Sequence, residues 1–96
     1  MEKIKLRLYI TGETPKSKKA VRDLESLCEP TFDDEVAIEI IDVLERPDLA
    51  HYEKIIVTPT LIKTLPPPVM RIIGDLSDKE KVLLKLGLIK EDLAPS

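Results

Sequence analysis

Cysteine and histidine, the residue types that most often supply a nucleophile or a base, each occur once, as Cys28 and His51. One cysteine allows neither an internal disulfide nor a Cys-x-x-Cys pair, and a zinc site needs several converging ligands. His51 stands beside Tyr52 and Glu53 in a polar stretch, with no nucleophile in sight that it could activate. These observations predict a surface histidine, no metal, no cofactor and a protein that is not an enzyme.

The acidic pairs and the glycines do not change this prediction. Asp33–Asp34 and the pair of Glu39 with Asp42 are interpreted as solvated charges of a loop and a strand. The three glycines lie far apart and predict turns, because a phosphate-binding loop needs several glycines in one short segment. These residues therefore favour a protein that acts by binding a partner rather than by catalysis.

The first half of the chain predicts a strand, a helix and a second strand. Residues 3–11 alternate between apolar and polar side chains, with Lys5, Arg7 and Tyr9 opposite the apolar face. Thr14–Pro15 predicts a helix start, and Pro30 is expected to end that helix. Residues 36–43 are apolar almost throughout and are expected to form an interior strand parallel to the first.

The helix of the first half is predicted to be amphipathic. Its polar side faces solvent, and Cys28 is interpreted as a small core residue, the alternative being a surface thiol that reports oxidation. The apolar stripe comprises Ala20, Val21, Leu24, Leu27 and Cys28.

Prolines organise the second half. Pro47 predicts the start of a helix, Pro59 opens a strand at residues 60–64, and three prolines at 66–68 precede another strand at 69–73. The buried side of the helix is expected to carry Leu49, Ala50, Tyr52, Ile55 and Ile56.

A last helix is predicted from Asp78 to about Leu86. Ser77 and Glu80 have the spacing of a capping box, with Ser77 as N-cap, and Gly87 suits the C-terminal end. The apolar face of this helix would comprise Val82, Leu83, Leu86 and Ile89.

The order β-α-β-α-β-β-α predicts an α/β fold, a single thioredoxin-like domain over residues 1–96 with a frayed tail at 91–96. That fold keeps a cis-proline where Pro59 stands, so Pro59 is the candidate for a structural cis-proline. Its redox cysteines follow the first strand, where this chain has Thr11-Gly12-Glu13-Thr14. Without a thiol there, disulfide exchange is not expected.

Bulk composition excludes several classes of partner. The formal net charge is −3 with acids and bases interleaved, and only three residues are aromatic, which argues against nucleic-acid binding. No apolar run approaches the roughly 20 residues of a membrane span, and no signal-peptide pattern is present. We expect a cytoplasmic protein that binds neither nucleic acid nor membrane.

Several segments together resemble the KaiB family of the prokaryotic circadian clock. They are Tyr9, Gly12-Glu13-Thr14-Pro15, Ile41-Asp42-Val43-Leu44, Thr58-Pro59-Thr60-Leu61, Leu65-Pro66-Pro67-Pro68-Val69 and Arg71-Ile72-Ile73-Gly74-Asp75-Leu76-Ser77. The resemblance covers about residues 4 to 90, and the triple proline is its most specific part.

The resemblance implies a binding protein whose partner is the N-terminal ring of KaiC, a hexameric ATPase. In the family, the KaiC ring captures the thioredoxin-like form. This binding helps to recruit or release output kinases and can sequester KaiA. The implied partner-binding residues surround the second strand and the following helix: Pro47, Asp48, Leu49, Lys54 and Arg71. Met70 departs from the family at the other position of a basic pair.

The resemblance also implies a second fold. KaiB proteins are metamorphic: the second half can rearrange into a ground-state fold that assembles as a tetramer. Lys85 stands where relatives often carry glycine, and glycine in a helix interior costs about 1 kcal/mol. A helix through Lys85 therefore forms more easily, which favours the thioredoxin-like form. Lys90 replaces a frequent aromatic residue, and a long acidic tail is absent. We therefore expect a thioredoxin-like monomer or dimer to dominate.

Three other functions remain open. A stress-response adaptor of a KaiC-like ATPase without a true oscillator would have nearly the same sequence. A sensor domain cut from a KaiB-like histidine kinase is disfavoured because the chain ends at Ser96 without a kinase. A thioredoxin-like redox protein is disfavoured by the absent thiol.

Overall fold

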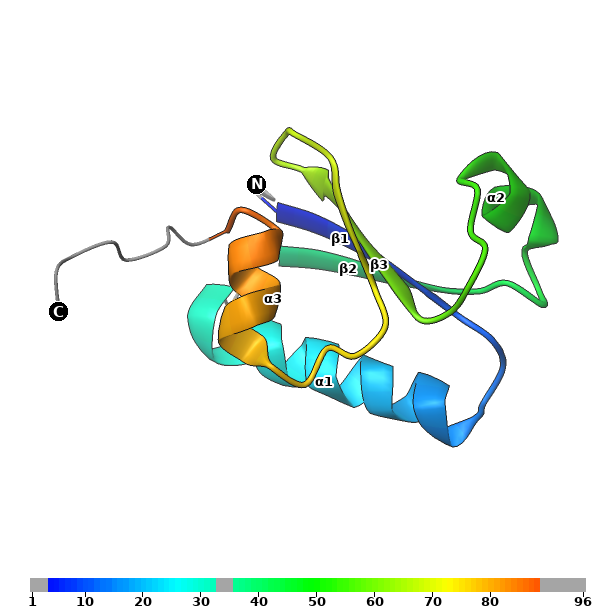
Figure 1. Ribbon diagram of the computed structural model, residues 1–96, viewed down its shortest axis with the longest axis horizontal. Helices are drawn as coiled ribbons and strands as arrows, with labels where there is room; N and C mark the ends of the chain where they lie inside the picture. The colour runs from blue at the N-terminus through cyan, green and yellow to red at the C-terminus, as the bar shows by residue number, and fades with distance from the viewer. Residues whose placement is uncertain (1–3, 33–35, 89–96) are drawn as a thin grey trace, which may run out of the picture.

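The computed structural model describes residues 4–32 and 36–88, with the backbone alone described for residues 28–32. The elements follow the predicted order (Figure 1). They are β1 (Ile4–Ile10), α1 (Pro15–Phe32), β2 (Val36–Asp42), α2 (Pro47–Tyr52), β3 (Thr60–Leu65), β4 (Met70–Ile73) and α3 (Lys79–Lys85).

The four strands form one sheet in the order β2-β1-β3-β4. β2 runs parallel to β1, as the strand-helix-strand unit predicts, and β3 is antiparallel to both β1 and β4. The prediction that residues 36–43 form an interior strand is wrong, because β1 and β3 occupy the interior and β2 lies at an edge. Ile38 and Ile40 are accordingly 36% and 42% exposed.

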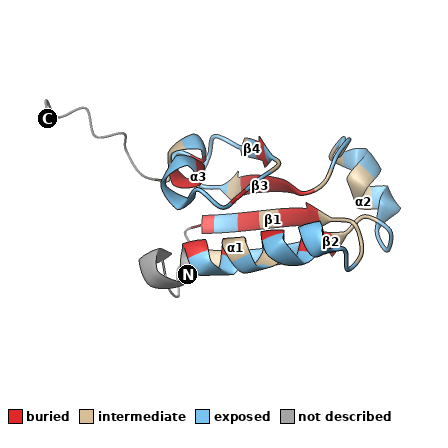
Figure 2. Ribbon diagram, turned by 60° about the horizontal axis from the view of Figure 1, so that its bottom comes forward, coloured by how far each residue is buried: buried red, intermediate tan, exposed pale blue. Residues whose placement is uncertain are grey.

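The main core lies between one face of the sheet and two helices, α1 and α3. Figure 2 shows α1 running along the sheet with its buried residues turned toward β1. The apolar stripe of α1 is confirmed for Ala20, Leu24 and Leu27, and that of α3 for Val82, Leu83 and Leu86. These residues pack with Ile4, Leu6, Leu8, Leu61, Ile72 and Leu76.

The other face of the sheet carries a smaller core beside α2. Tyr9, Ile41 and Ile62 are buried there, and Val43, Leu49 and Ile55 pack against them. Tyr9 was predicted on the polar side of its strand and is nevertheless fully buried. The alternation over residues 3–11 separated the two faces of β1 correctly. Near Tyr9, however, the second face is also covered, by the smaller core beside α2.

The predicted buried side of α2 is confirmed in part for Leu49 and Ile55, which are half-buried against the smaller core, and is wrong for Tyr52 and Ile56. None of its residues is buried, and Tyr52 and the following Ile56 are 81% and 95% exposed. The helix has only six residues and touches the sheet by one edge, through Leu49 and the neighbouring Ile55. A helix this short cannot turn five apolar side chains toward the same surface.

Helix α1 begins as predicted and ends later than predicted. The backbone N–H of Ser17 donates to the hydroxyl of Thr14 over 3.1 Å, which is an N-terminal cap, and Pro15 is the first helical residue. The helix continues past Pro30 to Phe32, so the expected end at Pro30 is wrong. The fixed φ of proline is compatible with helix, and near the C-terminus the lost N–H affects only one bond.

The N-cap of α3 is Asp78 and not Ser77. The Asp78 carboxylate accepts the Lys81 N–H over 3.1 Å, whereas the Ser77 hydroxyl donates to Asp75 over 2.7 Å. The capping box was therefore placed one residue early, because Asp75 competes for the serine. At the other end Gly87 has a φ of 72°, the left-handed conformation that glycine tolerates.

Replacing Asp78 by alanine is expected to lower the free energy of unfolding by about 1 kcal/mol, since one N–H of α3 loses its acceptor. Ser77→Ala should cost less, because Ser77 does not cap the helix. Urea denaturation of the two variants measures the difference, and an equal or larger loss for Ser77→Ala would contradict the assignment.

Several predictions lie outside the described residues. They concern the Asp33–Asp34 loop, Ile89, Lys90, the tail at 91–96 and the side chain of Cys28.

Candidate partner-binding surface

An ion pair between two residues close in sequence, Arg46 and Asp48, stands at the start of helix α2. Arg46 is the N-cap residue, Pro47 is the first helical residue, and the Arg46 guanidinium donates two hydrogen bonds to the carboxylate of Asp48, both over 3.1 Å. The hydrogen bonds from Arg46 lower the pKa of Asp48 below its usual value. Both side chains are exposed. This pair places two exposed, oppositely charged groups at the start of α2.

Helix α2 ends in a Schellman motif whose left-handed residue is a lysine. The N–H of Lys54 donates to the His51 carbonyl over 3.1 Å, and the N–H of Ile55 donates to the Ala50 carbonyl over 2.8 Å. Lys54 has a φ of 57°, where glycine is usual. A non-glycine residue there carries roughly 1–2 kcal/mol of backbone strain. The side chain of Lys54 itself is exposed.

Arg71 of β4 holds this turn against the sheet. Its guanidinium donates to the Glu53 carbonyl over 2.8 Å and to the Lys54 carbonyl over 3.3 Å. Met70, the neighbouring residue, packs with the main core on the opposite face. The departure at Met70 therefore falls on a position that points toward the core in this fold, whereas Arg71 lies on the face where α2 lies.

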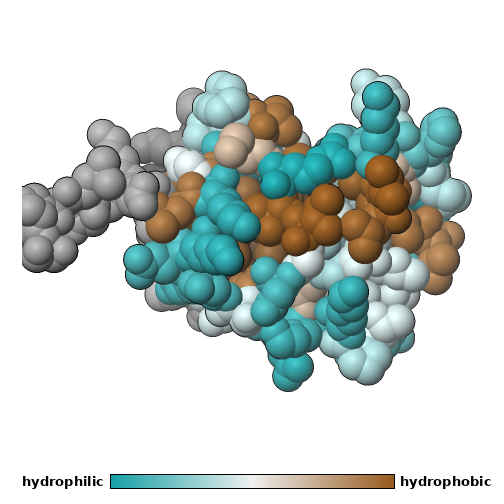
Figure 3. All heavy atoms as spheres, in the orientation of Figure 1, coloured by the Kyte–Doolittle hydropathy of each residue, from teal (hydrophilic) through white to brown (hydrophobic). Residues whose placement is uncertain are grey.

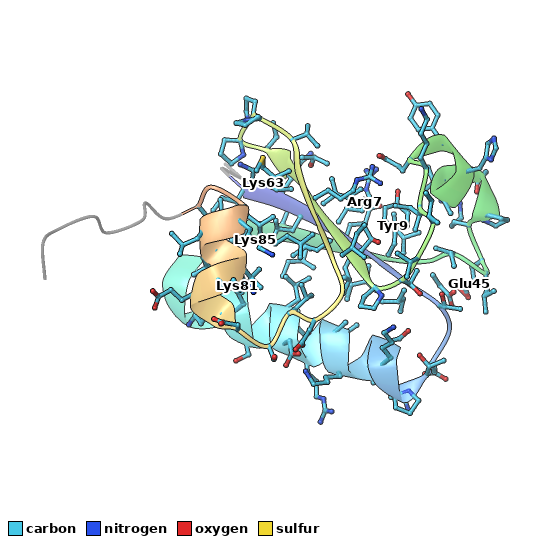
Figure 4. All side chains as sticks on the ribbon, viewed as in Figure 1. Arg7, Tyr9, Glu45, Lys63, Lys81 and Lys85 are labelled. Atoms are coloured by element: carbon cyan, nitrogen blue, oxygen red, sulfur yellow. The ribbon has the colours of Figure 1, made fainter. Side chains whose placement is uncertain are left out.

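Arg7 of β1 connects this turn to the edge strand. Its guanidinium donates to Glu53 over 2.9 Å and to Glu39 over 3.0 Å. Beneath it, the hydroxyl of Tyr9 is buried without a hydrogen-bond partner among the described residues. Burial raises the pKa of Tyr9 above its usual value, and the nearby Arg7 guanidinium offsets part of that rise. Figure 4 shows Arg7 and Tyr9 side by side on the sheet.

Exposed apolar side chains surround α2 and the segment that follows it. Sequence reasoning missed Tyr52 and Ile56 as surface residues because their spacing suggested a buried helix face. Figure 3 shows an apolar band that crosses the molecule toward the side where α2 lies. We call the following set the α2 apolar rim: Leu44, Tyr52, Ile56, Val57 and Ile73.

The structure brings the predicted partner-binding residues to one side of the molecule. Pro47, Asp48 and Leu49 form the first turn of α2, and Lys54 follows that helix. Arg71 reaches Lys54 from β4. The side chains of Pro47, Asp48, Lys54 and Arg71 are exposed, and Leu49 is half-buried. His51 is exposed, as predicted.

The segment after β1 contains no thiol. The hydroxyls of Thr11 and Thr58 share a hydrogen bond of 2.6 Å there, and the Gly12 N–H donates to Asp42 over 3.0 Å. Thr58–Pro59 is a cis peptide, and Pro59 is buried. Within residues 4–32 and 36–88, no group of three or more acidic, cysteine or histidine residues could hold a metal, and no helix is suited to crossing a membrane.

Comparison with solved structures defines the class of fold. The N-terminal domain of SasA from Synechococcus elongatus matches with a TM-score of 0.71 at 24% identity, over 95% of this chain and 90% of that one. Mitochondrial thioredoxin 3 from Saccharomyces cerevisiae matches with a TM-score of 0.71 at 18% identity, over 93% and 81%. The chain has a thioredoxin-like fold, as predicted.

Comparison of sequences defines the family. The KaiB domain matches residues 7–88. Circadian clock protein KaiB3 of Synechocystis sp. is 54% identical over 97% of this chain and 91% of its own length. Circadian clock oscillator protein KaiB of Prochlorococcus marinus subsp. pastoris is 52% identical over 95% and 85%. The chain belongs to the KaiB family, which confirms the resemblance.

Proposed function

We propose that this chain is a regulatory protein without catalytic activity that binds the N-terminal ring of a hexameric KaiC-type ATPase in a circadian or timing system. It would bind in the thioredoxin-like form described here and act in the cytoplasm as a monomer or dimer. Family membership supports the partner, and the exposed surface around α2 supports the place of contact.

The observation that carries this proposal is the pairing of exposed apolar groups with a strained turn. Tyr52 and Ile56 expose large apolar surfaces on either side of Lys54, whose backbone is left-handed. Strained residues persist where the surrounding structure fixes them and often serve a function there. Large exposed apolar side chains next to charged ones are typical of protein-protein interfaces.

Lys54→Gly separates the folding role of this turn from its binding role. Glycine removes the left-handed strain, so the free energy of unfolding should stay unchanged or rise by about 0.5–1 kcal/mol. If the lysine side chain contacts the ring, affinity should fall although the fold is stabilised. Thermal unfolding and titration against the KaiC-type ATPase test both effects. Unchanged affinity would remove Lys54 from the proposed surface.

Two further partners are proposed from the shared fold and from family membership. The fold is shared with the SasA N-terminal domain, and we propose that a histidine kinase with such a domain competes with this chain for the ring. KaiA is proposed as a protein that the ring-bound chain sequesters. A competition experiment with a labelled kinase domain and increasing amounts of this chain tests the first of these proposals.

The direct test of the function is size-exclusion chromatography with light scattering, on the chain alone and mixed with the KaiC-type ATPase and ATP. A monomer or dimer that shifts into a ring-sized complex is the expected result. A tetramer that binds only after hours would mean that the alternative fold dominates. No complex with any nucleotide would overturn the proposal, and disulfide reduction of insulin would then test the redox alternative.

A further inference from the structure

Helix α2 and the turn that follows it stand at one end of the molecule, away from α1 and α3 (Figure 1). The Arg46 N–H donates to the Asp42 carbonyl over 2.9 Å on one side of this segment, and the Thr60 hydroxyl donates to the Val57 carbonyl over 2.6 Å on the other. In the described part of the chain, no backbone-to-backbone hydrogen bond joins residues 47–56 to a strand. We call residues 47–56 the α2 lid.

Two arginines of the sheet hold the α2 lid, and both act at the same turn. Arg7 of β1 donates through Nη1 to the Glu53 carboxylate over 2.9 Å. Arg71 of β4 donates to the carbonyls of Glu53 and Lys54 over 2.8 and 3.3 Å. The side chains of Arg7 and Glu53 are 29% and 22% exposed, so water screens this ion pair less than it screens a fully exposed one.

The apolar contacts of the α2 lid are sparse. Within the lid, Leu49 and Ile55 pack against the smaller core, and both are only half-buried. No residue of α2 itself is buried. A helix of six residues is not stable alone in water, since isolated helices need about 12–15 residues. The hydrogen bonds within α2 therefore depend on its attachment to the sheet.

The closed lid covers a polar group of the sheet. The Tyr9 hydroxyl is buried without a hydrogen-bond partner among the described residues, in the cluster against which the lid packs. The neighbouring Arg7 guanidinium directs its hydrogen bonds to Glu39 and Glu53 instead (Figure 4). A buried hydroxyl without a partner costs free energy, which is recovered when water reaches it. Closure of the lid is therefore opposed by Tyr9 and favoured by the ion pair of Arg7.

We propose that the α2 lid detaches from the sheet while the four strands stay paired, and that the Arg7–Glu53 ion pair is the latch that keeps it closed over the Tyr9 hydroxyl. Detachment breaks this ion pair and the two hydrogen bonds from Arg71, and it hydrates the hydroxyl. The proposal goes beyond the proposed function, because it concerns the free chain and holds whichever partner binds around α2.

Glu53→Gln tests the latch, because glutamine has the same shape as glutamate and lacks the charge. Glu39→Gln is the matched control, since Glu39 also accepts from Arg7, over 3.0 Å, but belongs to β2. Amide hydrogen exchange of Ala50 and Ile55, whose N–H groups are bonded within this segment, reports detachment. Glu53→Gln should speed exchange at both amides about fivefold, the effect of losing a half-buried ion pair. Glu39→Gln should leave it nearly unchanged.

Tyr9→Phe should change exchange in the opposite direction. It removes the unpartnered hydroxyl from the closed state, so exchange at Ala50 and Ile55 should slow about fivefold. The unaltered chain tests local detachment without any substitution. In low concentrations of urea, exchange at these two amides should be faster than in the interior strands β1 and β3 and nearly independent of urea, because detachment of a short segment exposes little surface.

Three results would overturn the proposal. Equal exchange rates and equal urea dependence in the lid and in β1 and β3 would show that the lid opens only on global unfolding. Equal effects of Glu53→Gln and Glu39→Gln would show that the Arg7–Glu53 pair is not a latch. Unchanged or faster exchange in Tyr9→Phe would show that the hydroxyl does not oppose closure.

Discussion

Ile56→Asp is expected to weaken binding to the KaiC-type ring by about thirtyfold or more while the chain remains folded. Ile56 is 95% exposed and makes no part of either core cluster, so a carboxylate there remains solvated in the free protein. In the complex, the same carboxylate would replace an apolar contact and lose water without a partner. Loss of a central apolar contact typically costs 2 kcal/mol or more, which is roughly thirtyfold in affinity.

Val69→Asp is the matched control for that experiment. Val69 is also an exposed apolar residue, but it follows the triple proline between β3 and β4, outside the α2 apolar rim. Isothermal titration with the ring ATPase should give wild-type affinity for Val69→Asp. Equal losses in both variants would show that added charge alone weakens binding, and wild-type affinity for Ile56→Asp would remove the rim from the interface.

Leu8→Ala is expected to lower the free energy of unfolding by about 3–4 kcal/mol. Leu8 lies on β1 between β2 and β3, is fully buried and packs in the main core. Truncation of a buried leucine costs about 2–5 kcal/mol, the larger values arising where the cavity cannot collapse. Domains of this size have a total stability of about 5–15 kcal/mol, so the variant would be close to unfolding.

Ile40→Ala provides the comparison within the same sheet, because Ile40 pairs directly with Leu8 in the parallel ladder. It is 42% exposed at the edge of the sheet, and its truncation should cost about 1 kcal/mol. Chemical denaturation of both variants measures the difference. Similar losses would indicate that β2 is covered in solution, for example by a second copy of the chain.

The first half of the fold follows from local pattern. Alternation in β1, the Thr14–Pro15 helix start and the stripe of α1 each predict a single element. All three elements are confirmed, the stripe for Ala20, Leu24 and Leu27. The position of β2 could not be read in this way, because an apolar strand fits an interior or an edge position equally well. Its place depends on where β3 enters the sheet, and that is decided by residues 60–65, much further along the chain.

The second half shows a different limit of sequence reasoning. The five apolar residues from Leu49 to Ile56 have the composition of a buried helix face, yet α2 ends at Tyr52 and the Lys54 turn directs Ile56 to solvent. Nothing in the local pattern marks Lys54 as left-handed, since glycine is the usual signal. The candidate residues around α2 therefore came only from the family resemblance and remain a prediction, and the α2 apolar rim was missed.

Lys63, a buried residue of β3, also escapes pattern reasoning. A lysine in an alternating strand predicts a polar face, but the register of β3 places position 63 toward α3. Register is a property of the paired strands and not of one strand's composition. Polar residues on a core face are therefore found only once the pairing is known.

Hydrogen exchange of the chain in complex with the KaiC-type ATPase shows most directly whether the ring binds around α2. We expect slower exchange at residues 44–57 and 71–73, the surface formed by α2, the Lys54 turn and β4. Exchange in the first turns of α1 should remain as in the free chain. Protection confined to α1 and α3, with α2 unchanged, would show that the ring binds the opposite face and would overturn the proposed surface.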